Sequence, residues 1–200
     1  IEIAVALDPT NSLIRSYVGK AYYEENTKER DLLASGQFNL AKQFDRNDPT
    51  PWFYDAILKQ AENRPVDALE DLQKSIERND NRAVYRSKFL LDEDLAARNA
   101  RQARVYRELG FEQLALAEAY MSLSVDPTDF SGHRLFADAF LSRPRHEVAK
   151  VSELLQSQLW QPLNVSPIEP QLSDAQPLIL SGTGPASIGL TEFNPLFVGD

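Results

Sequence analysis

The feature that most constrains the fold is a recurring pair of small residues. Three pairs of alanines share a spacing of twelve residues: Ala56 and Ala68, Ala103 and Ala115, and Ala137 and Ala149. In the last two pairs an aromatic residue, Tyr106 or Phe140, follows the first alanine by three positions. Small residues at matched points on two successive helices let the helices approach closely, and the aromatic fills the gap beside them. The spacing therefore predicts helix–turn–helix repeats, an architecture that usually binds other molecules rather than catalysing reactions.

The charge balance argues against several classes of partner. Thirty Asp and Glu against 21 Lys and Arg give the 200-residue chain a net charge of −9. An acidic chain repels phosphate backbones and anionic membrane surfaces, so we expect no nucleic-acid partner. The sequence has no run of about 18 apolar residues, so we also expect no direct membrane insertion of this segment.

Helical spacing of apolar residues predicts about four helix pairs within residues 1–160. They follow a helix ending at Leu7, whose start we expect to be missing from the chain. The pairs are expected over residues 12–25 and 29–44, from Pro51 and from Pro65, from Asp92 across a turn at Gly110, and over 131–141 and 145–160. Asp-Pro steps at Asp8, Asp48 and Asp126 mark the repeat boundaries, because proline does not continue a helix.

Two segments depart from this rhythm. The interval from Ala56 to Ala103 is 47 residues, and the surplus over the other repeats falls in residues 82–94. This segment contains apolar residues such as Val84 and Phe89, so we predict a short extra helix or an ordered loop packed against the repeats. The next long helix is expected to begin at Asp92, where acidic residues complement the helix dipole. Residues 161–200 are rich in proline and glycine, and we interpret them as an extended tail or linker.

The spacing resembles the tetratricopeptide repeat over roughly residues 4–160. One copy carries the pattern through Ala103, Tyr106, Ala115 and Pro127. The others carry it through Gly19, Tyr22, Ala34, Phe38 and Ala41; Trp52, Ala56, Ala68 and Leu72; and Ala137, Phe140 and Ala149. In the second copy Lys59 stands where the aromatic is expected. The resemblance implies an all-α, right-handed superhelical solenoid.

A second resemblance is to the repeat section of large bacterial envelope proteins, in which such repeats precede an outer-membrane β-barrel. It is carried by residues 91–116 and by the proline-rich exit around Trp160 and Pro162. This resemblance implies a periplasmic or outer-membrane-associated location. A cytoplasmic location is the alternative, since nothing in the composition decides between them.

The tetratricopeptide resemblance implies a ligand groove lined by the first helix of each pair. Its expected lining residues are Lys20, Tyr23, Phe53, Ile57, Gln60, Arg104, Arg107, Arg134 and Asp138. This set is basic and aromatic within an acidic chain, which favours an acidic or extended peptide segment of a protein partner. The alternative interpretation is that the arginines are solvated or pair with acidic residues on neighbouring turns.

The sequence favours an interaction module without catalytic activity. With no cysteine and two histidines on different predicted helices, His133 and His146, it offers no recognisable metal site and no catalytic dyad. The glycine-rich stretch from Ser181 to Pro185 lacks the lysine of a phosphate-binding loop, and we expect no cofactor. The competing hypothesis is a structural spacer or self-assembly element of a larger cell-envelope protein, which would associate with itself or dock its own tail.

Overall fold

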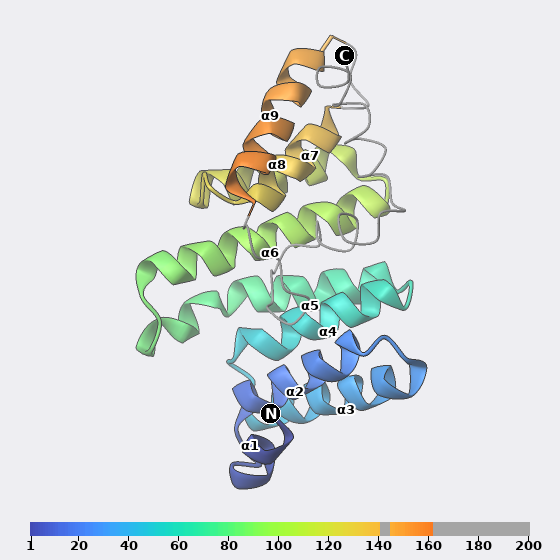
Figure 1. Ribbon diagram of the computed structural model, residues 1–200, viewed down its shortest axis with the longest axis vertical. Coiled ribbons are helices and arrows are strands. Elements are labelled where there is room, and N and C mark those ends of the chain that lie inside the picture. Colours follow the sequence, from blue (N-terminus) through green and yellow to red (C-terminus); the bar gives the residue numbers. More distant parts are fainter. Residues whose placement is uncertain (141–144, 162–200) are drawn as a thin grey trace, which may run out of the picture.

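Ten helical segments follow one another through the described part of the chain (Figure 1). The computed structural model describes residues 1–140 and 145–161. The segments are α1 (Glu2–Leu7), α2 (Ser12–Glu24), α3 (Lys28–Phe44), α4 (Pro49–Ala61), α5 (Pro65–Glu77), the 3-10 helix η1 (Asn79–Val84), α6 (Lys88–Glu108), α7 (Glu112–Val125), α8 (Phe130–Ala139) and α9 (Glu147–Trp160). They contain 81% of the described residues, so the connections between them are short.

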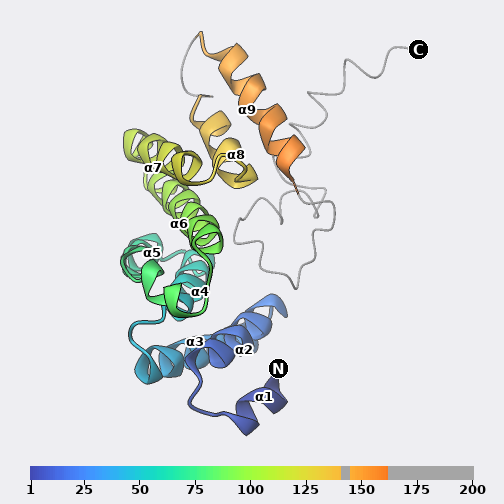
Figure 2. The ribbon, with the colours of Figure 1, turned by 90° about the vertical axis from the view of Figure 1, so that its left-hand side faces the viewer.

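The helices pack as four antiparallel pairs stacked in one direction. The pairs are α2 with α3, α4 with α5, α6 with α7, and α8 with α9, and the second helix of each pair also contacts the first helix of the next. Figure 2 shows α2, α4 and α6 on one side of the stack and α3, α5 and α7 on the other. The prediction of an all-α solenoid is confirmed.

A left-handed residue lies in the described part of the turn inside each pair. Asn26, Asn63, Gly110 and Arg145 have φ values of 53°, 60°, 83° and 68°. Asparagine and glycine tolerate this conformation, whereas arginine adopts it at a steric cost. The expected turn at Gly110 is therefore present, and the same backbone device recurs without glycine in the other three pairs.

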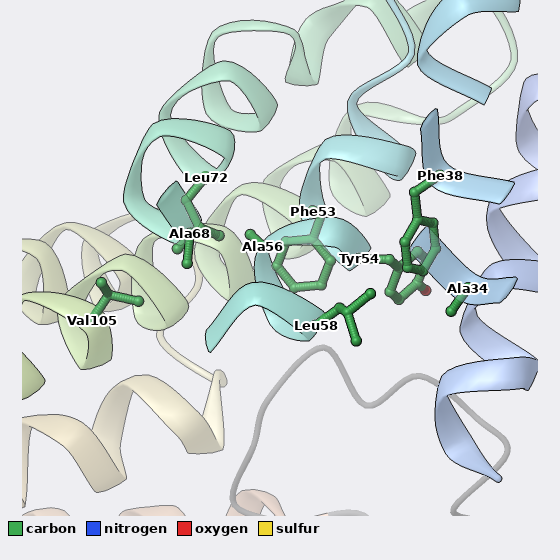
Figure 3. Close-up of a cluster of buried hydrophobic side chains, with 9 residues drawn as sticks. All are labelled: Ala34, Phe38, Phe53, Tyr54, Ala56, Leu58, Ala68, Leu72 and Val105. Carbon is green, nitrogen blue, oxygen red and sulfur yellow. The ribbon is translucent and has the colours of Figure 1, made fainter. Parts of the chain in front are cut away.

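The small residues of the repeat lie where helices touch, as predicted. Ala34, Ala56, Ala68 and Ala103 are at most 1% exposed. A cluster of buried side chains connects the first three pairs (Figure 3): Ala34, Phe38, Phe53, Tyr54, Ala56, Leu58, Ala68, Leu72 and Val105. The core is therefore continuous from one repeat to the next, which is how a solenoid buries apolar surface that a single pair cannot.

Two buried carboxylates and two half-buried ammonium groups join α3, α4 and α5. Lys42 Nζ lies 2.5 Å from Asp55 Oδ2 and 2.9 Å from Asp71 Oδ2. Lys59 Nζ lies 3.1 Å from Asp55 Oδ2 and 2.5 Å from Asp71 Oδ2. Both carboxylates have side chains only 4% exposed, and the ammonium groups beside them offset the cost of their desolvation. Lys59, the residue that replaces the expected aromatic in this repeat, thus shares both of its carboxylate partners with Lys42.

The insertion between the second and third pairs differs from the prediction. The long helix begins at Lys88 rather than Asp92, because the Ser87 hydroxyl accepts the Leu90 N–H at 3.4 Å and caps it. The expected short helix is η1, but it does not pack all the apolar residues of the insertion. Val84 and Phe89 are 92% and 73% exposed, whereas Leu91 is buried.

A buried arginine anchors this insertion. Arg98 of α6 is 2% exposed and donates from Nε to Ser75 Oγ of α5 at 2.8 Å and from Nη1 to Asn79 Oδ1 of η1. Burial foremost lowers the pKa of the Arg98 guanidinium to about 10, which leaves it charged at neutral pH. The packing of η1 therefore depends on polar contacts that hydrophobic periodicity does not reveal.

Other boundaries shift by a few residues. The helix expected from Pro51 begins at Pro49, where the Asp48 carboxylate accepts the Thr50 N–H at 2.9 Å. The helix expected from Arg145 begins at Glu147. The helix expected over 131–141 is described from Phe130 to Ala139. The predicted tail lies outside the described residues, apart from Gln161.

Candidate functional site

The candidate groove lies along the inner layer, which consists of α2, α4, α6 and α8. Figure 2 shows the stack curving so that α2, α4 and α6 lie on its concave side. The nine residues predicted for the groove all belong to them: Lys20 and Tyr23 to α2; Phe53, Ile57 and Gln60 to α4; Arg104 and Arg107 to α6; Arg134 and Asp138 to α8. Contacts between α2 and α4, and between α6 and α8, hold neighbouring inner helices together.

Two of these residues are buried and do not present a side chain to a ligand. Phe53 is 1% exposed and packs edge-on against Tyr54 inside the core, with ring centroids 5.6 Å apart. Lys20 is 7% exposed, and its Nζ lies 3.1 Å from Glu24 Oε1. The assignment of Phe53 and Lys20 to a ligand-contacting surface is therefore corrected. Tyr23 and Ile57 are half-buried and pack against the same core cluster.

The predicted arginines have carboxylate partners within the chain. Arg104 Nε lies 3.2 Å from Glu108 Oε1. Arg107 Nη1 lies 2.6 Å from Asp138 Oδ2, and Arg134 Nε lies 3.7 Å from Asp138 Oδ1. Two arginines thus share the single carboxylate of Asp138. This pairing reduces the positive charge of the groove without cancelling it.

Polar contacts also link the inner helices of different pairs. Gln60 of α4 donates from Nε2 to Glu108 Oε2 of α6 at 2.6 Å. The Arg107–Asp138 ion pair links α6 to α8. The predicted residues Gln60, Arg107 and Asp138 therefore lie at two successive junctions of the inner layer rather than along one helix.

A small cavity opens at the junction of the third and fourth pairs. Its volume is about 100 Å³, and its lining comprises Ala103, Arg107, Glu112, Ala115, Leu135, Asp138 and Ala139. The walls are mainly aliphatic, and charged groups of both signs stand among them. A space of this size accepts a small apolar side chain but not a drug-sized molecule, for which pockets of about 300 Å³ or more are usual.

Arg101 is a basic residue of the inner layer that the sequence analysis missed. It is 5% exposed on α6, and burial foremost, then the like charge of Arg104, lowers the pKa of its guanidinium to about 9. Burial raises the pKa of the half-buried Tyr23, and Arg101 and Arg104 oppose that rise, which places both arginines in the electrostatic surroundings of the phenol. Arg101 precedes Arg104 by three residues and so shares its helix face, a spacing that could have identified it.

The histidine and acidic residues form no metal centre in the described ranges. Within residues 1–140 and 145–161, no group of three His, Asp or Glu side chains is arranged to hold an ion. His133 Nδ1 instead lies 2.6 Å from Glu153 Oε2, and Nε2 lies 2.9 Å from the Pro127 carbonyl oxygen. His133 therefore connects α8 to α9. Among the described helices, none combines the length and the apolar character that crossing a membrane requires.

Comparison with known proteins shows the fold. No protein-family description matches the chain, and no curated protein does. Among solved structures, the chain is similar to MamA, with 15% identity and a TM-score of 0.59 over 80% of this chain and 83% of that one. It is also similar to Pseudomonas aeruginosa pilF, with 14% identity and a TM-score of 0.64 over 98% and 81%.

A third similar structure is a chain of the APC/C hetero-tetramer Cut9–Hcn1, with 16% identity and a TM-score of 0.66 over 82% of this chain and 30% of that one. All three are tetratricopeptide-repeat structures, so the tetratricopeptide-like fold of this chain is shown. Identities this low carry the fold and nothing further.

Proposed function

We propose that this chain is a non-catalytic protein-interaction module that binds an extended peptide segment along its inner layer. The tetratricopeptide-like fold supports a role in protein–protein interaction or scaffolding. Extended peptides suit such a layer, because successive helices offer contacts at regular intervals along a curved surface.

The cavity between the third and fourth pairs is the observation that carries this proposal. It places two predicted groove residues, Arg107 and Asp138, beside the repeat alanines Ala103 and Ala115. A small apolar side chain of the peptide would fill the aliphatic space. The charged groups at the cavity would orient the peptide backbone and the neighbouring side chains.

We further propose that the favoured segment is acidic. Arg107 and Arg134 share Asp138, and the half-buried Arg104 adds positive charge near Tyr23. The carboxylates of Glu108 and Glu112 temper this charge, so the expected effect is a preference among peptides rather than strong binding of any anion.

A peptide-binding assay on the 200-residue chain tests this proposal. Synthetic extended peptides of equal length, acidic, neutral and basic, are titrated by fluorescence polarisation. We expect acidic peptides carrying small apolar side chains to bind best, with affinity falling as salt rises. Ala139→Leu, which fills the cavity from a half-buried position, is expected to weaken binding about tenfold, or about 1.4 kcal/mol.

Matched variants separate the groove from general effects. Ala117→Leu makes the same change on the exposed side of α7, and it should leave binding unchanged. Arg104→Gln with Arg107→Gln should abolish the preference for acidic peptides, whereas Arg46→Gln with Arg64→Gln, on exposed connections, should preserve it. Equal binding of acidic and basic peptides would overturn the acidic preference. Equal losses of peptide affinity in the test and control variants would overturn the proposal that the peptide binds in the groove.

A second candidate function is that of a structural or self-assembly element. The exposed apolar side of α9, at the end of the described stack, favours it. If the Arg104→Gln and Arg107→Gln double variant loses peptide binding but assembles as before, the groove is supported. If its assembly changes while peptide binding does not, the assembly function is supported.

The periplasmic or outer-membrane location stays a prediction from the resemblance alone, with the cytoplasm as its alternative, and fractionation of the source cells tests it.

A further inference from the structure

The charged residues of this chain are distributed unevenly along the sequence. All 21 Lys and Arg residues precede residue 162. Residues 162–200, the tail beyond Gln161, carry four acidic residues and no basic one: Glu169, Asp174, Glu192 and Asp200. Six residues of the tail are prolines, which favour an extended backbone over a helix. In charge and in expected conformation, the tail is thus an acidic, extended peptide joined to the described helices.

The inner layer offers the opposite charge to such a peptide. Arg107 is exposed, and Arg104 and Arg134 are half-buried. Their partners Glu108 and Asp138 set two negative charges against these three positive ones. An acidic segment that lies along α6 and α8 therefore meets a net positive charge.

The cavity between the third and fourth pairs suits one part of the tail. Its aliphatic walls accept a small apolar side chain, and Arg107 stands at its lining. In the tail, Ala175 directly follows Asp174. This dipeptide combines a methyl group small enough for the cavity with a carboxylate for the neighbouring arginine.

The tail begins within reach of this cavity. α9 packs against α8, which contributes Leu135, Asp138 and Ala139 to the lining. Because α9 runs back along α8, its last turn lies about one helix length, about 20 Å for 14 residues, from that end of α8. Figures 1 and 2 both show this last turn as the end of α9 nearer to α6. The chain from Gln161 to Asp174 spans up to about 40 Å when it is extended.

We propose that residues 165–177 occupy the inner layer of their own chain, with Ala175 at the cavity and Asp174 beside Arg107. This inference rests on the proposed peptide groove and names an occupant for it. The root-mean-square length of a flexible linker from Gln161 to Asp174 is about 20 Å, similar to the distance it must span, so tethering provides an effective concentration of about 1 mM. A segment with a dissociation constant of about 0.1 mM would then fill about nine grooves in ten and weaken the binding of other peptides about tenfold.

Substitutions in the tail of the whole chain test this occupancy. Glu169→Gln with Asp174→Asn removes both charges of the docked segment. We expect a labelled acidic peptide to bind this variant about tenfold more tightly than the natural chain, measured by fluorescence polarisation. Glu192→Gln with Asp200→Asn makes the same change outside the segment and should leave the affinity nearly unchanged.

The outcomes separate this inference from the groove on which it rests. Equal peptide affinity in the natural chain and in the variant Glu169→Gln with Asp174→Asn would overturn the inference and leave the groove intact. If the peptide binds none of these chains, the proposed function fails, and cross-linking decides where the tail lies.

Introduced cysteines locate the tail directly, since the natural chain has no cysteine. Ala139→Cys at the cavity with Ala175→Cys in the tail should oxidise readily to a disulfide within one chain at low protein concentration. Ala117→Cys, on the exposed side of α7, with Ala175→Cys is the control and should oxidise much more slowly. Similar rates for the two pairs would overturn the proposal. Disulfides that form mainly between two chains would overturn the assignment of the tail to its own groove.

Discussion

Gly19 of α2 and Phe38 of α3 pack so closely that no side chain larger than hydrogen fits at position 19. A methyl group added to Gly19 would stand 2.6 Å from Cε1 of the Phe38 ring, a ring that is itself fully buried. The two residues lie on the paired helices of the first repeat. Their contact is an example of the small-residue packing that defines the repeats.

Gly19→Ala is therefore expected to destabilise the protein by about 1–3 kcal/mol, because the ring or the helix must move. Gly36→Ala is the matched control: it lies within α3, and its added methyl would meet nothing within 4 Å. There the gain in helix propensity should stabilise the protein by about 0.5–1 kcal/mol. Urea denaturation measures both changes. Equal effects of the two substitutions would contradict the close contact.

The buried charge network makes stability depend on pH in the acid range. Burial alone would raise the pKa of Asp55, but Lys42 and Lys59 together hold it below its ordinary value. A carboxyl with a lowered pKa in the folded state binds protons more readily in the unfolded state. Its contribution is thus complete above the unfolded pKa of about 4 and declines as the pH falls further.

Urea titrations between neutral pH and pH 3 test this dependence. Asp55→Asn should lower stability at neutral pH, since it leaves two ammonium groups beside one carboxylate. Asp55→Asn should also make the free energy of unfolding fall less steeply as the pH is lowered. Asp67→Asn, in the exposed ion pair of Asp67 with Arg64, should change the acid slope much less. An unaltered slope in Asp55→Asn would show that the network does not respond to acid through Asp55.

The contact of His133 with Glu153 should control how readily α9 separates from α8. Nδ1 of His133 lies 2.6 Å from the Glu153 carboxylate of α9 and its Nε2 lies 2.9 Å from the Pro127 carbonyl oxygen, so the ring joins the two helices through polar contacts at both nitrogens. Glu153→Gln removes the charged acceptor and should ease opening of α9 by about 1 kcal/mol. Amide hydrogen exchange over residues 147–160 measures this. Glu147→Gln, at an exposed position in the first turn, should change exchange less, and an equal change would contradict the assigned role of Glu153.

Arg98 should be replaceable neither by lysine nor by an apolar residue. Its planar guanidinium reaches Ser75 and Asn79 together, a geometry that a single ammonium group does not reproduce. Arg98→Lys should cost about 1–3 kcal/mol and speed hydrogen exchange in η1 before other helices. Arg46→Lys, on an exposed connection, is the control, and similar exchange in both variants would overturn this account.

The repeats could be predicted because their signal is local. Gly19, Ala103 and Ala115 contact helices that neighbour them in sequence, so a fixed spacing is enough to place them. The network of Lys42, Asp55, Lys59 and Asp71 could not be predicted this way, because it joins three helices and matches charges up to 29 residues apart. The anchoring of η1 by Arg98 is hidden for the same reason.

The positions of the candidate groove residues in the fold could be predicted only in part. The helical periodicity correctly assigned all nine residues to helices of the inner layer. Periodicity within one helix does not, however, specify which side chains the neighbouring helices cover. Phe53 belongs to the inner-layer helix α4, but its side chain is buried in the core, where Arg98 Cζ of α6 lies 5.8 Å from the centroid of its ring. The cavity at Arg107 and Asp138 depends on how α6, α7 and α8 meet, which no spacing within one helix specifies.

The packing of each helix pair against its immediate neighbours also has a consequence for synthesis on the ribosome. α2 and α3 find their main partners within the first 61 residues, and α4 and α5 within the first 108. Each stretch of core can thus close while later residues are still being added, because no helix of the first half waits for one near the end of the described chain. Folding can proceed from the first repeat onward in the order of translation. The exposed apolar surface of the growing chain then stays close to that of one incompletely synthesised helix pair.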